Sequence, residues 1–536
     1  MAVSLAALLA VSLVAVPLLT LLLLATKRPS NHPKRADDDG RRLPPSPPGA
    51  LPLIGHIHQL GRLPHRALRS LAASHGPVIL LRLGSAPTVV VSSAAAAEEA
   101  MKTRDAAFAS RPRSAMADRL VYGSRDITFA PYGEYWRQAR RVCAVHLLSH
   151  RRTASFRRVR EREAAALVAR IRHHAAADGG GAVNMSDALF CYSKAVVTRA
   201  AFGDREYGLD GDEGGDKLRR VFADLQELLM ATPVREVAPW LGWVDTLTGL
   251  DARAKRTFDA LDGVLERVIA DHRARRRRHQ DGQRILEDDD DHRDFVDVLL
   301  DVNEMDKDTG LRLDTDNMKA IIMDMFAAGT DTSYTVLEWA MAELVNHPEK
   351  MRKLQSEIRA AAGDATATGH LVTEDHLAGA PYLKAVISET LRLHAPAPLL
   401  APRETTEDTE LLGYRVPAGT RVLVNAWAIG RDPELWDRAE EFVPERFAAG
   451  DPLLEYSKVG QDLRFLAFGA GRRGCPGAGF AAPSVELALA NVLYHFDWAA
   501  LPATLGTPVV DMTEAYGLTV RLKKPLLVVA KPWSGR

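Results

Sequence analysis

The ten residues from Phe468 to Gly477 constrain the fold and chemistry of this chain more than any other segment. They read F-G-A-G-R-R-G-C-P-G and precede an apolar run with helical spacing from Val485 to Phe496. Glycine has no Cβ, so a glycine-rich backbone can adopt left-handed angles and pass close to a flat ligand. The amides that follow Cys475, and the positive end of the following helix, favour a thiolate. The segment predicts a loop that offers sulfur to iron, although an inert buried cysteine in a glycine turn also fits.

The chain contains three cysteines, and their number and spacing limit the other roles of sulfur. Cys143, Cys191 and Cys475 are far apart in the sequence. An odd, scattered set forms neither a disulfide framework nor a paired zinc motif, and it favours a reducing, cytosol-facing compartment. Cys143 and Cys191 lack glycine-rich surroundings, so we expect them to be small apolar side chains in the core.

The N-terminus has the composition of a membrane anchor. Residues 2–26 carry no charge, and roughly 20 apolar residues suffice to span a bilayer as a helix. A cleaved signal peptide would carry positive charge before the apolar run, whereas here the basic residues follow it and favour a cytosolic body. They are Lys27, Arg28, Lys34, Arg35, Arg41 and Arg42. We predict an anchor over 1–26, a basic and proline-rich hinge over 27–52, and a folded body over 53–536.

The body is predicted to be mainly α-helical with small β-sheets. The β-rich runs Val78–Leu83 and Thr88–Ser92 flank Gly84–Pro87 and predict a hairpin. A second hairpin is predicted near Leu518–Ala530. Apolar residues between these regions mostly recur at intervals of three and four, which is typical of amphipathic helices.

The charge balance argues against a nucleic-acid partner. Acidic and basic residues number 69 each, so the formal net charge is zero. The basic run Arg273–Arg278 is followed by the acidic run Glu287–Asp291, and an acidic neighbour would repel phosphate. We interpret this stretch as an exposed, mobile connection without a role of its own.

A long apolar run from Met318 to Val345 predicts a helix with an unusual small and polar patch in its middle. Thr332 stands four residues after Ala328, so its hydroxyl can bond to that carbonyl and open the helix locally. Asp331 and Thr332 together offer a carboxylate and a hydroxyl that can transfer protons. Ordinary solvent-facing polar residues are the alternative.

The cysteine loop resembles the haem-binding signature of the cytochrome P-450 family, F-x-x-G-x-R-x-C-x-G, at every fixed position. These positions are Phe468, Gly471, Arg473, Cys475 and Gly477. Ala467 departs from the proline that plant members usually carry. The mid-helix patch resembles the family's oxygen-activating A-G-x-D-T-S motif, and further similar motifs run along the whole body. The resemblance is to plant microsomal A-type members and implies one haem-centred domain, the cytochrome P-450 fold, besides the N-terminal transmembrane helix.

The resemblance implies a role for each motif residue around haem b, iron protoporphyrin IX. Cys475 would be the proximal ligand to the metal, Phe468 would pack near its sulfur, and Gly477 belongs to the same cofactor loop. Propionate contacts would come from Arg473, from Arg403, and from the helix that carries Trp136 and Arg140. Thr332 and Asp331 would be catalytic and deliver the protons that cleavage of the O–O bond requires.

Two further motifs resemble the family's buried scaffold. Glu389 and Arg392 are three residues apart, as in E-x-x-R, and Arg446 lies in P-E-R-F. A surface ion pair would have the same helical spacing. The resemblance implies instead a buried Glu-Arg-Arg cluster that fixes the segment leading to the cysteine.

The implied activity is a monooxygenase that inserts one atom of O₂ into a small apolar plant metabolite. Electrons would come from NADPH through NADPH–cytochrome P-450 reductase, docked on basic residues such as Arg137, Arg141 and Arg472 unless these are ordinary surface residues. The body would face the cytosol from the endoplasmic reticulum membrane on a single span. Substrate would contact Ser114–Phe129, Ala397–Leu400 and Tyr516–Leu518. A non-catalytic membrane-tethered haem protein and a haem-thiolate isomerase or dehydratase are the alternatives.

Overall fold

The computed structural model describes most of the body. It covers residues 42–177, 182–205, 207, 212–280, 293–305, 313–363, 371–448, 460–501 and 509–534. The predicted anchor over 1–26, most of the predicted hinge and the acidic run Glu287–Asp291 lie outside these ranges. Within them, no helix combines the length and apolar character needed to cross a membrane.

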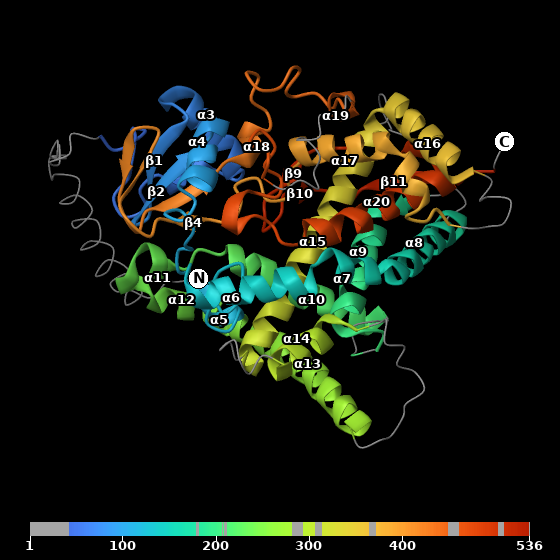
Figure 1. Ribbon diagram of the computed structural model, residues 1–536. Coiled ribbons are helices and arrows are strands. Elements are labelled where there is room, and N and C mark those ends of the chain that lie inside the picture. The colour runs from blue at the N-terminus through green and yellow to red at the C-terminus, as the bar shows by residue number, and fades with distance from the viewer. Residues whose placement is uncertain are drawn as a thin grey trace, which may run out of the picture.

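Helices make up most of the molecule, as predicted, and the strands form small sheets (Figure 1). The α-helices are α2 Ile57–Leu60, α3 Pro64–His75, α4 Ala94–Glu98, α5 Ala115–Leu120, α6 Glu134–Val142, α7 His150–Ser155, α8 Arg157–Ala177, α9 Met185–Phe202, α10 Asp212–Met230, α11 Val234–Val237, α12 Trp243–Leu247, α13 Leu250–Gln280, α14 Phe295–Met305, α15 Thr315–Asn346, α16 Pro348–Ala362, α17 Pro381–Leu393, α18 Ala426–Ile429, α19 Glu445–Ala448 and α20 Ala478–His495. Short π and 3-10 segments include Cys143–Leu147 and η7, Gly471–Arg473.

The largest sheet contains the first predicted hairpin. Its order is β1-β2-β7-β4, and the strands are β1 Val78–Leu83, β2 Ala86–Val91, β7 Arg421–Val424 and β4 Arg403–Glu404. β1 and β2 pair antiparallel from Val78↔Val91 to Leu83↔Ala86, which confirms the hairpin and starts its second strand two residues earlier than predicted. β2 pairs parallel with β7, and β4 continues the sheet antiparallel. The sheet thus brings Arg403 beside segments from the start of the body.

The predicted hairpin over Leu518–Ala530 is wrong. β10, Arg521–Leu522, pairs with β9, Glu514–Ala515, and not with the strand that follows it. β11, Leu527–Pro532, lies between β3, Ala182–Asn184, and β8, Phe496–Ala500. Val528 and Ala530 on β11 are buried in the main core, so packing against distant elements outweighs pairing with the nearest strand. The two-stranded sheet of β5, Thr409–Leu411, and β6, Tyr414–Val416, completes the set.

The basic run Arg273–Arg278 is helical, so its predicted assignment to a loop is wrong. It forms the last turns of α13. Arg276 Nη2 donates to Asp301 Oδ1 of α14 at 2.6 Å, and Arg273 Nη2 donates to Thr315 Oγ1 at the start of α15 at 2.9 Å. Arg273 and Arg276 therefore bind α13 to α15 and α14, because their polar and acidic partners come from these helices.

Helix α15 confirms the long helix predicted over Met318–Val345 and crosses the middle of the molecule (Figure 1). Asp314 caps its first turn by accepting from the Asn317 amide at 2.8 Å. The sequence His347–Pro348 follows its last residue and starts α16. Most of its side chains are buried because α9, α17 and α20 pack around it. A polar patch on such a helix is therefore not an ordinary solvent-facing surface.

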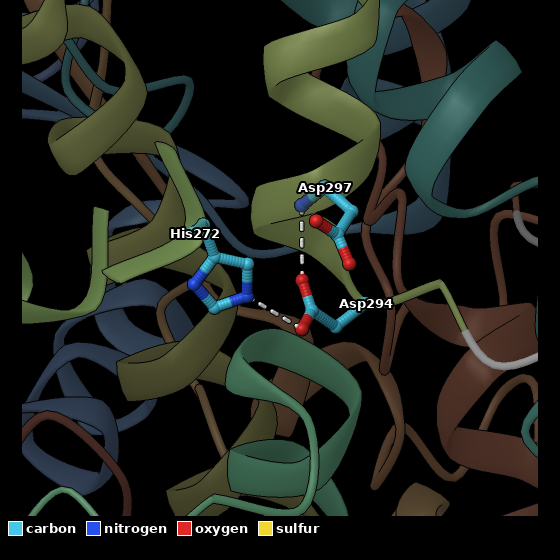
Figure 2. A group of neighbouring side chains, drawn as sticks. All are labelled: His272, Asp294 and Asp297. Atoms are coloured by element: carbon cyan, nitrogen blue, oxygen red, sulfur yellow. Dashed lines mark hydrogen bonds and ion pairs between the residues drawn. The ribbon is translucent and has the colours of Figure 1, made fainter. Parts of the chain in front are cut away.

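A buried histidine links α13 to α14 (Figure 2). His272 Nδ1 lies 2.7 Å from the Val268 carbonyl oxygen, and Nε2 lies 2.8 Å from Asp294 Oδ2. Both partners are acceptors, so both ring nitrogens carry hydrogen and His272 is an imidazolium. Burial opposes this charge, but the hydrogen bond and charge of Asp294 outweigh it and the pKa of His272 is raised.

His272, Asp294 and Asp297 also lie close enough together to be considered as metal ligands, the one such group in the described ranges. A metal would need the lone pair of Nε2, which here is protonated and directed at Asp294. Asp294 Oδ1 in turn accepts from the Asp297 amide at 2.9 Å and caps α14. We therefore interpret the group as a structural ion pair.

Replacing His272 should destabilise the protein in a pH-dependent way. A raised folded pKa means that the pair stabilises fully below the unfolded pKa of about 6.5 and that this stabilisation is lost as pH rises through the folded pKa. We expect His272→Leu to lower the free energy of unfolding by about 3–5 kcal/mol at pH 6, and by less at higher pH. Denaturant unfolding across pH measures this. The exposed His58→Leu variant is the control, and an equal loss for His272→Leu at every pH would contradict the assignment.

Candidate active site

The cysteine loop is closed by its own backbone. The Cys475 amide donates to the Phe468 carbonyl at 2.8 Å, and α20 begins three residues after the cysteine. Phe468 is half-buried at the edge of the main core, so it connects the loop to that core. The loop thus has the predicted position, directly before an amphipathic helix.

The sulfur of Cys475 lies among groups that act on its ionisation in opposite directions. The amides of Gly477 and Ala478 bond to it, and a Cβ at Gly477 would lie at an ordinary contact distance of 3.8 Å from Sγ. Burial raises the pKa of the thiol, whereas these amides and the charge of Arg140 lower it. The side chain keeps accessible surface. Because burial disfavours a free thiolate, the donor set suits a sulfur bound to a positive metal ion.

Gly471 allows the loop to approach the preceding part of the chain closely. Its φ is +66°, and a Cβ there would lie 2.1 Å from the Met101 carbonyl oxygen and 2.6 Å from Asp105 Oδ1. Asp105 is buried and accepts from the Arg472 amide at 2.9 Å and from Arg403 Nη1 at 3.2 Å. The sequence motifs did not identify Asp105, because an acidic residue outside a motif carries no signal of its partners.

Four arginines surround the loop, and we call them the arginine group: Arg111, Arg140, Arg403 and Arg473. Arg140 Nη2 donates to the Gly474 carbonyl at 2.5 Å, and Arg403 Nη2 donates to the Ala470 carbonyl at 2.9 Å. Arg473 donates to the carbonyls of Ala109, Ile127 and Ala130 at 2.7, 3.2 and 2.6 Å. Among the described residues, these three bonds leave two of its five N–H groups for another acceptor. Three of the four arginines were predicted, and Arg111 was missed.

The arginine group is a concentration of buried positive charge. Burial lowers the pKa of Arg473 to about 9, and the charge of Arg403 contributes. Burial, followed by the charges of Arg473 and Arg403, lowers the pKa of Arg111 well below its usual value. Neighbouring cations that lower one another's pKa attract anions. Two carboxylates on one flat ligand, as in the propionates of haem, fit this requirement.

Trp136 completes the contact between the loop and α6. Its Nε1 donates to the Ile127 carbonyl at 2.9 Å. The guanidinium carbon of Arg473 lies 4.1 Å from the centre of a Trp136 ring, which is a cation–π contact. The structure therefore brings together Cys475, Arg140, Arg473 and Trp136, which the sequence motifs had predicted as cofactor contacts.

The small residues of α15 form an accessible patch on a mostly buried helix. Ala328 is exposed, and Ala327, Gly329 and Thr332 are half-buried. Thr332 Oγ1 donates to the Ala328 carbonyl at 2.6 Å, which confirms the predicted bond. The helix remains continuous from Thr315 to Asn346, so the predicted local opening is wrong; the hydroxyl shares the carbonyl without breaking the helix.

Asp331 points away from Thr332 and toward the C-terminal turn. Thr519 Oγ1 donates to Asp331 Oδ2 at 2.5 Å, and Gln226 also bonds to this carboxyl. Burial raises the pKa of Asp331, and these two bonds lower it. Successive helical residues project about 100° apart, so adjacent positions in the sequence do not place the carboxyl and the Thr332 hydroxyl together.

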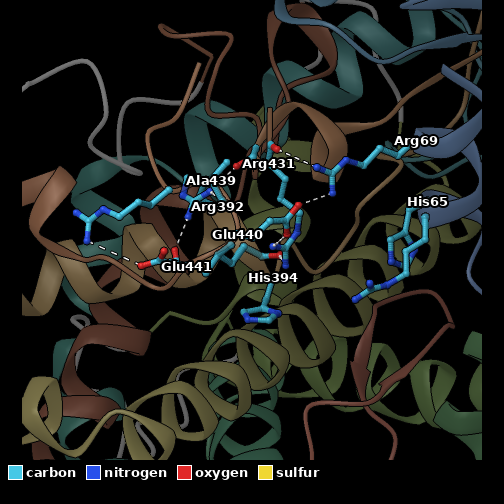
Figure 3. A network of polar contacts seen from close by, with 12 residues as sticks. His65, Arg69, Arg392, His394, Arg431, Ala439, Glu440 and Glu441 are labelled. Atoms are coloured by element: carbon cyan, nitrogen blue, oxygen red, sulfur yellow. Dashed lines mark hydrogen bonds and ion pairs between the residues drawn. The ribbon is translucent and has the colours of Figure 1, made fainter. Parts of the chain in front are cut away.

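The predicted Glu-Arg-Arg cluster is confirmed, and Figure 3 shows one of its members, Arg392, beside Ala439 and Glu441. Arg392 donates to both Glu389 carboxylate oxygens at 2.6 and 2.8 Å, and Arg446 Nε donates to Glu389 Oε1 at 3.1 Å. Arg392 also bonds the carbonyls of Gly430, Ala439 and Glu441. Glu389 is fully buried and Arg392 nearly so. The cluster thus fixes a long connection that leads toward the cysteine loop.

Comparisons with known proteins agree with this arrangement. The cytochrome P450 family model matches residues 44–527. The chain is 47% identical over 478 residues to cytochrome P450 71A1 of Persea americana, covering 89% of this chain and 91% of that protein. This chain belongs to the cytochrome P450 family. It is also 44% identical to norfluorocurarine oxidase of Strychnos sp over 91% of this chain and 92% of that one.

A solved P450 structure shares the fold. A zebrafish cytochrome P450, in a structure with abiraterone, superimposes with a TM-score of 0.71 at 25% identity, over 88% of this chain and 100% of the other. The chain is a plant A-type P450 with haem as its cofactor, and its activity is that of an oxygen-incorporating monooxygenase. A P450 of this kind works on a small organic substrate and O₂ with a redox partner.

Removing Glu389 should disrupt the P450 scaffold. Glu389→Gln leaves Arg392 and Arg446 without their buried counter-charge, and we expect it to lower the free energy of unfolding by about 3–5 kcal/mol. Denaturant unfolding and the haem content of the purified protein measure the effect. The control is Glu441→Gln, an exposed carboxylate whose loss should change stability by less than about 1 kcal/mol. Similar values for the two variants would refute the role of the cluster.

Proposed function

We propose that this P450 is a haem-thiolate monooxygenase with Cys475 as the proximal ligand of the haem iron. The observation that carries the proposal is the environment of the Cys475 sulfur: burial raises the pKa of the thiol, while two backbone amides and the charge of Arg140 oppose this, so a positive metal ion would complete the stabilisation of a thiolate. The spare N–H groups of Arg473, with Arg140 and Arg403, would hold the propionates. Phe468, Gly477 and Trp136 would support the same face of the cofactor.

The catalytic side is proposed to be the accessible patch of α15. When bound, the haem supplies the iron chemistry that puts one oxygen atom of O₂ into the substrate and releases the other as water. Thr332 would hold and pass a proton from its hydroxyl, which the Ala328 carbonyl orients. Asp331, buried and bonded to Thr519, would act by way of the C-terminal turn, from a position about 100° round the helix from Thr332. A retained hydroxyl in the patch favours a monooxygenase over an isomerase, a dehydratase or a non-catalytic haem protein.

The substrate is proposed to be a small apolar plant metabolite. The Val520 amide donates to the Pro396 carbonyl at 2.9 Å, and Trp339 of α15 donates to the Val520 carbonyl at 2.9 Å. These bonds bring the segments Ala397–Leu400 and Tyr516–Leu518 near one side of α15. Leu399 and Leu518, together with residues 114–129, are therefore our candidates for substrate contacts.

The electron donor is proposed to be NADPH–cytochrome P450 reductase. Arg137 and Arg141 are exposed on α6, the helix that also carries Trp136 and Arg140. Arg472 is about half exposed, although it also pairs with Asp105 at 3.0 Å. A basic surface near the cysteine loop suits an acidic donor, since complementary charge speeds association.

Attachment to the endoplasmic reticulum membrane through a single span at residues 1–26 is also proposed. The body has exposed apolar side chains at the end where its chain begins: Leu51 and Leu53 are each 44% exposed, and Trp240, Trp243 and Leu247 are 64, 59 and 76% exposed. Ser85 in the turn of the first hairpin donates to the Glu236 carbonyl of α11 at 3.5 Å, and Gly55 pairs with Leu83. These apolar residues are thus on neighbouring segments that can face a bilayer, with the site in the cytosol.

Replacing Cys475 tests the proposed ligand directly. The reduced, carbon-monoxide-bound wild-type protein should show the red-shifted absorption band of a thiolate-ligated haem. Cys475→Ser should lose this band and NADPH-dependent turnover, because the hydroxyl remains protonated. The matched Cys191→Ser variant should retain both. An unchanged band and turnover in Cys475→Ser would rule out this ligand.

Replacing Thr332 tests the proposed proton donor. Thr332→Ala should reduce product formation by about a hundredfold, the lower range for a lost general acid, while the carbon-monoxide band stays intact. Thr332→Ser keeps the hydroxyl and should recover most of the rate. Turnover with reductase and NADPH, on a substrate found by its binding spectrum, provides the measurement. A rate of product formation in Thr332→Ala equal to that of the wild type would exclude Thr332 as the proton donor.

A further inference from the structure

Two carboxyl groups that the sequence motifs did not identify are buried against each other. Asp126 is fully buried, and Asp324 of α15 is 9% exposed. A side-chain hydrogen bond joins them, while Asp126 Oδ1 meets no ordinary donor in the described structure. Two ionised carboxylates have only acceptor atoms, so such a bond requires a proton on one of them.

The donors around the pair indicate which carboxyl is ionised. Asp324 Oδ2 accepts from the amides of Ile127 and Thr128 at 2.9 and 3.0 Å, and Oδ1 accepts from the Thr128 hydroxyl at 2.7 Å. Asp126 accepts from the Phe129 amide at 3.1 Å. Three donors stabilise a negative charge on Asp324 better than one does on Asp126. The proton therefore belongs on Asp126.

Charged and titratable groups surround the pair from several elements. They are Arg111, Tyr135, Arg140, Cys143 and Arg473. Burial, and then the charge of Asp324, raises the pKa of Asp126 well above its usual value. The charge of Arg111 lowers the pKa of Asp126, but less than burial and Asp324 raise it. The guanidinium of Arg111 donates to the carbonyls of Thr128, Ala401 and Pro402.

The residues beside Asp126 connect the two halves of the candidate site, and we call residues 126–130 the strap. Its amides at Ile127 and Thr128 bond to Asp324 on α15. Its carbonyls point the other way: those of Ile127 and Ala130 accept from Arg473, and that of Ile127 also accepts from Trp136. The strap therefore runs from α15 to Arg473 within the cysteine loop.

Asp324 also has a defined place relative to the accessible patch. It precedes Ala328 by four residues and Thr332 by eight, so the three residues lie near one face of α15 on successive turns. One turn advances a helix by about 5.4 Å. The carboxyl pair thus lies about one helical turn from the accessible patch of α15, and the strap connects it to Arg473.

We propose that Asp126 and Asp324 share one proton and act as a positioning pair, which fixes the strap between α15 and Arg473 and so holds the haem in register with the patch. The inference rests on the proposed role of Arg473 in haem binding. Asp126 lies within the segment 114–129 proposed above for substrate contacts, but the positioning role requires no contact of either carboxyl with the haem or the substrate. Loss of the shared hydrogen bond should loosen the strap and weaken retention of the cofactor.

The test uses the full-length haem-loaded protein and two substitutions at one position. Asp126→Asn keeps a donor toward Asp324 without a titrating proton, whereas Asp126→Leu removes it. Asp316→Asn is the control, because Asp316 is an exposed carboxylate on α15, the helix that carries Asp324. We measure the infrared carbonyl band of protonated carboxyl groups, and the rate at which haem passes to an excess of apomyoglobin.

The difference spectrum of wild type minus Asp126→Asn should show a protonated carboxyl band that is absent from the Asp316→Asn difference. Haem loss should be about tenfold faster in Asp126→Leu, the size expected from one lost hydrogen bond to a charged group, and within about twofold of wild type in Asp126→Asn. A missing band, equal loss rates in wild type and Asp126→Leu, or equally fast loss in both variants would overturn the proposal. The carboxyl band does not depend on Cys475, so failure of the proposed ligand would appear separately, in the carbon-monoxide spectrum of the wild type.

Discussion

Burial of positive charge around the cysteine loop is the constraint on which the rest of the site depends. Arg111, Arg140, Arg403 and Arg473 donate hydrogen bonds to backbone carbonyls. Burial, and then the charge of Arg403, lowers the pKa of Arg473 to about 9. Carbonyls satisfy hydrogen bonds but do not neutralise charge. A thiolate and two propionates would supply the missing negative charge, so the protein part of the site becomes electrostatically complete when haem is bound.

The arginines can hold this arrangement only because other interactions fix the chain on both sides of the loop. Asp105 ties Arg403 and the Arg472 amide to the start of the body, at a position where Gly471 leaves room for the approach. The Glu389 cluster fixes the preceding connection with charged bonds, of which the Glu389–Arg392 pair is fully enclosed. A buried cluster of this kind contributes specificity of position more than net stability. The scaffold and the binding loop thus form one electrostatic unit.

The strap connects α15, which carries Thr332, to the same electrostatic unit. Asp324 holds the amides of residues 127 and 128, while the carbonyls of the same short segment hold Arg473 and Trp136. A displacement of α15 would therefore also displace the arginine group. Seven residues further on, two turns along nearly the same face of the helix, Asp331 and Thr519 join α15 to the C-terminal turn. Polar contacts at two points along one face give a largely apolar helix a defined rotation about its axis.

The sequence by itself determined the parts whose chemistry is local. The spacing around Cys475, the length of α15, the Thr332–Ala328 bond and the Glu389–Arg392 pair follow from neighbouring residues, and the structure contains each of them. Tertiary structure decided the rest. It gave β11 partners other than β10, made the Arg273 run helical, turned Asp331 away from Thr332, and paired Asp126 with Asp324. These outcomes depend on partners up to nearly 350 residues away, and the energy of burying a strand, an arginine or a carboxyl is set by those partners and not by adjacent residues.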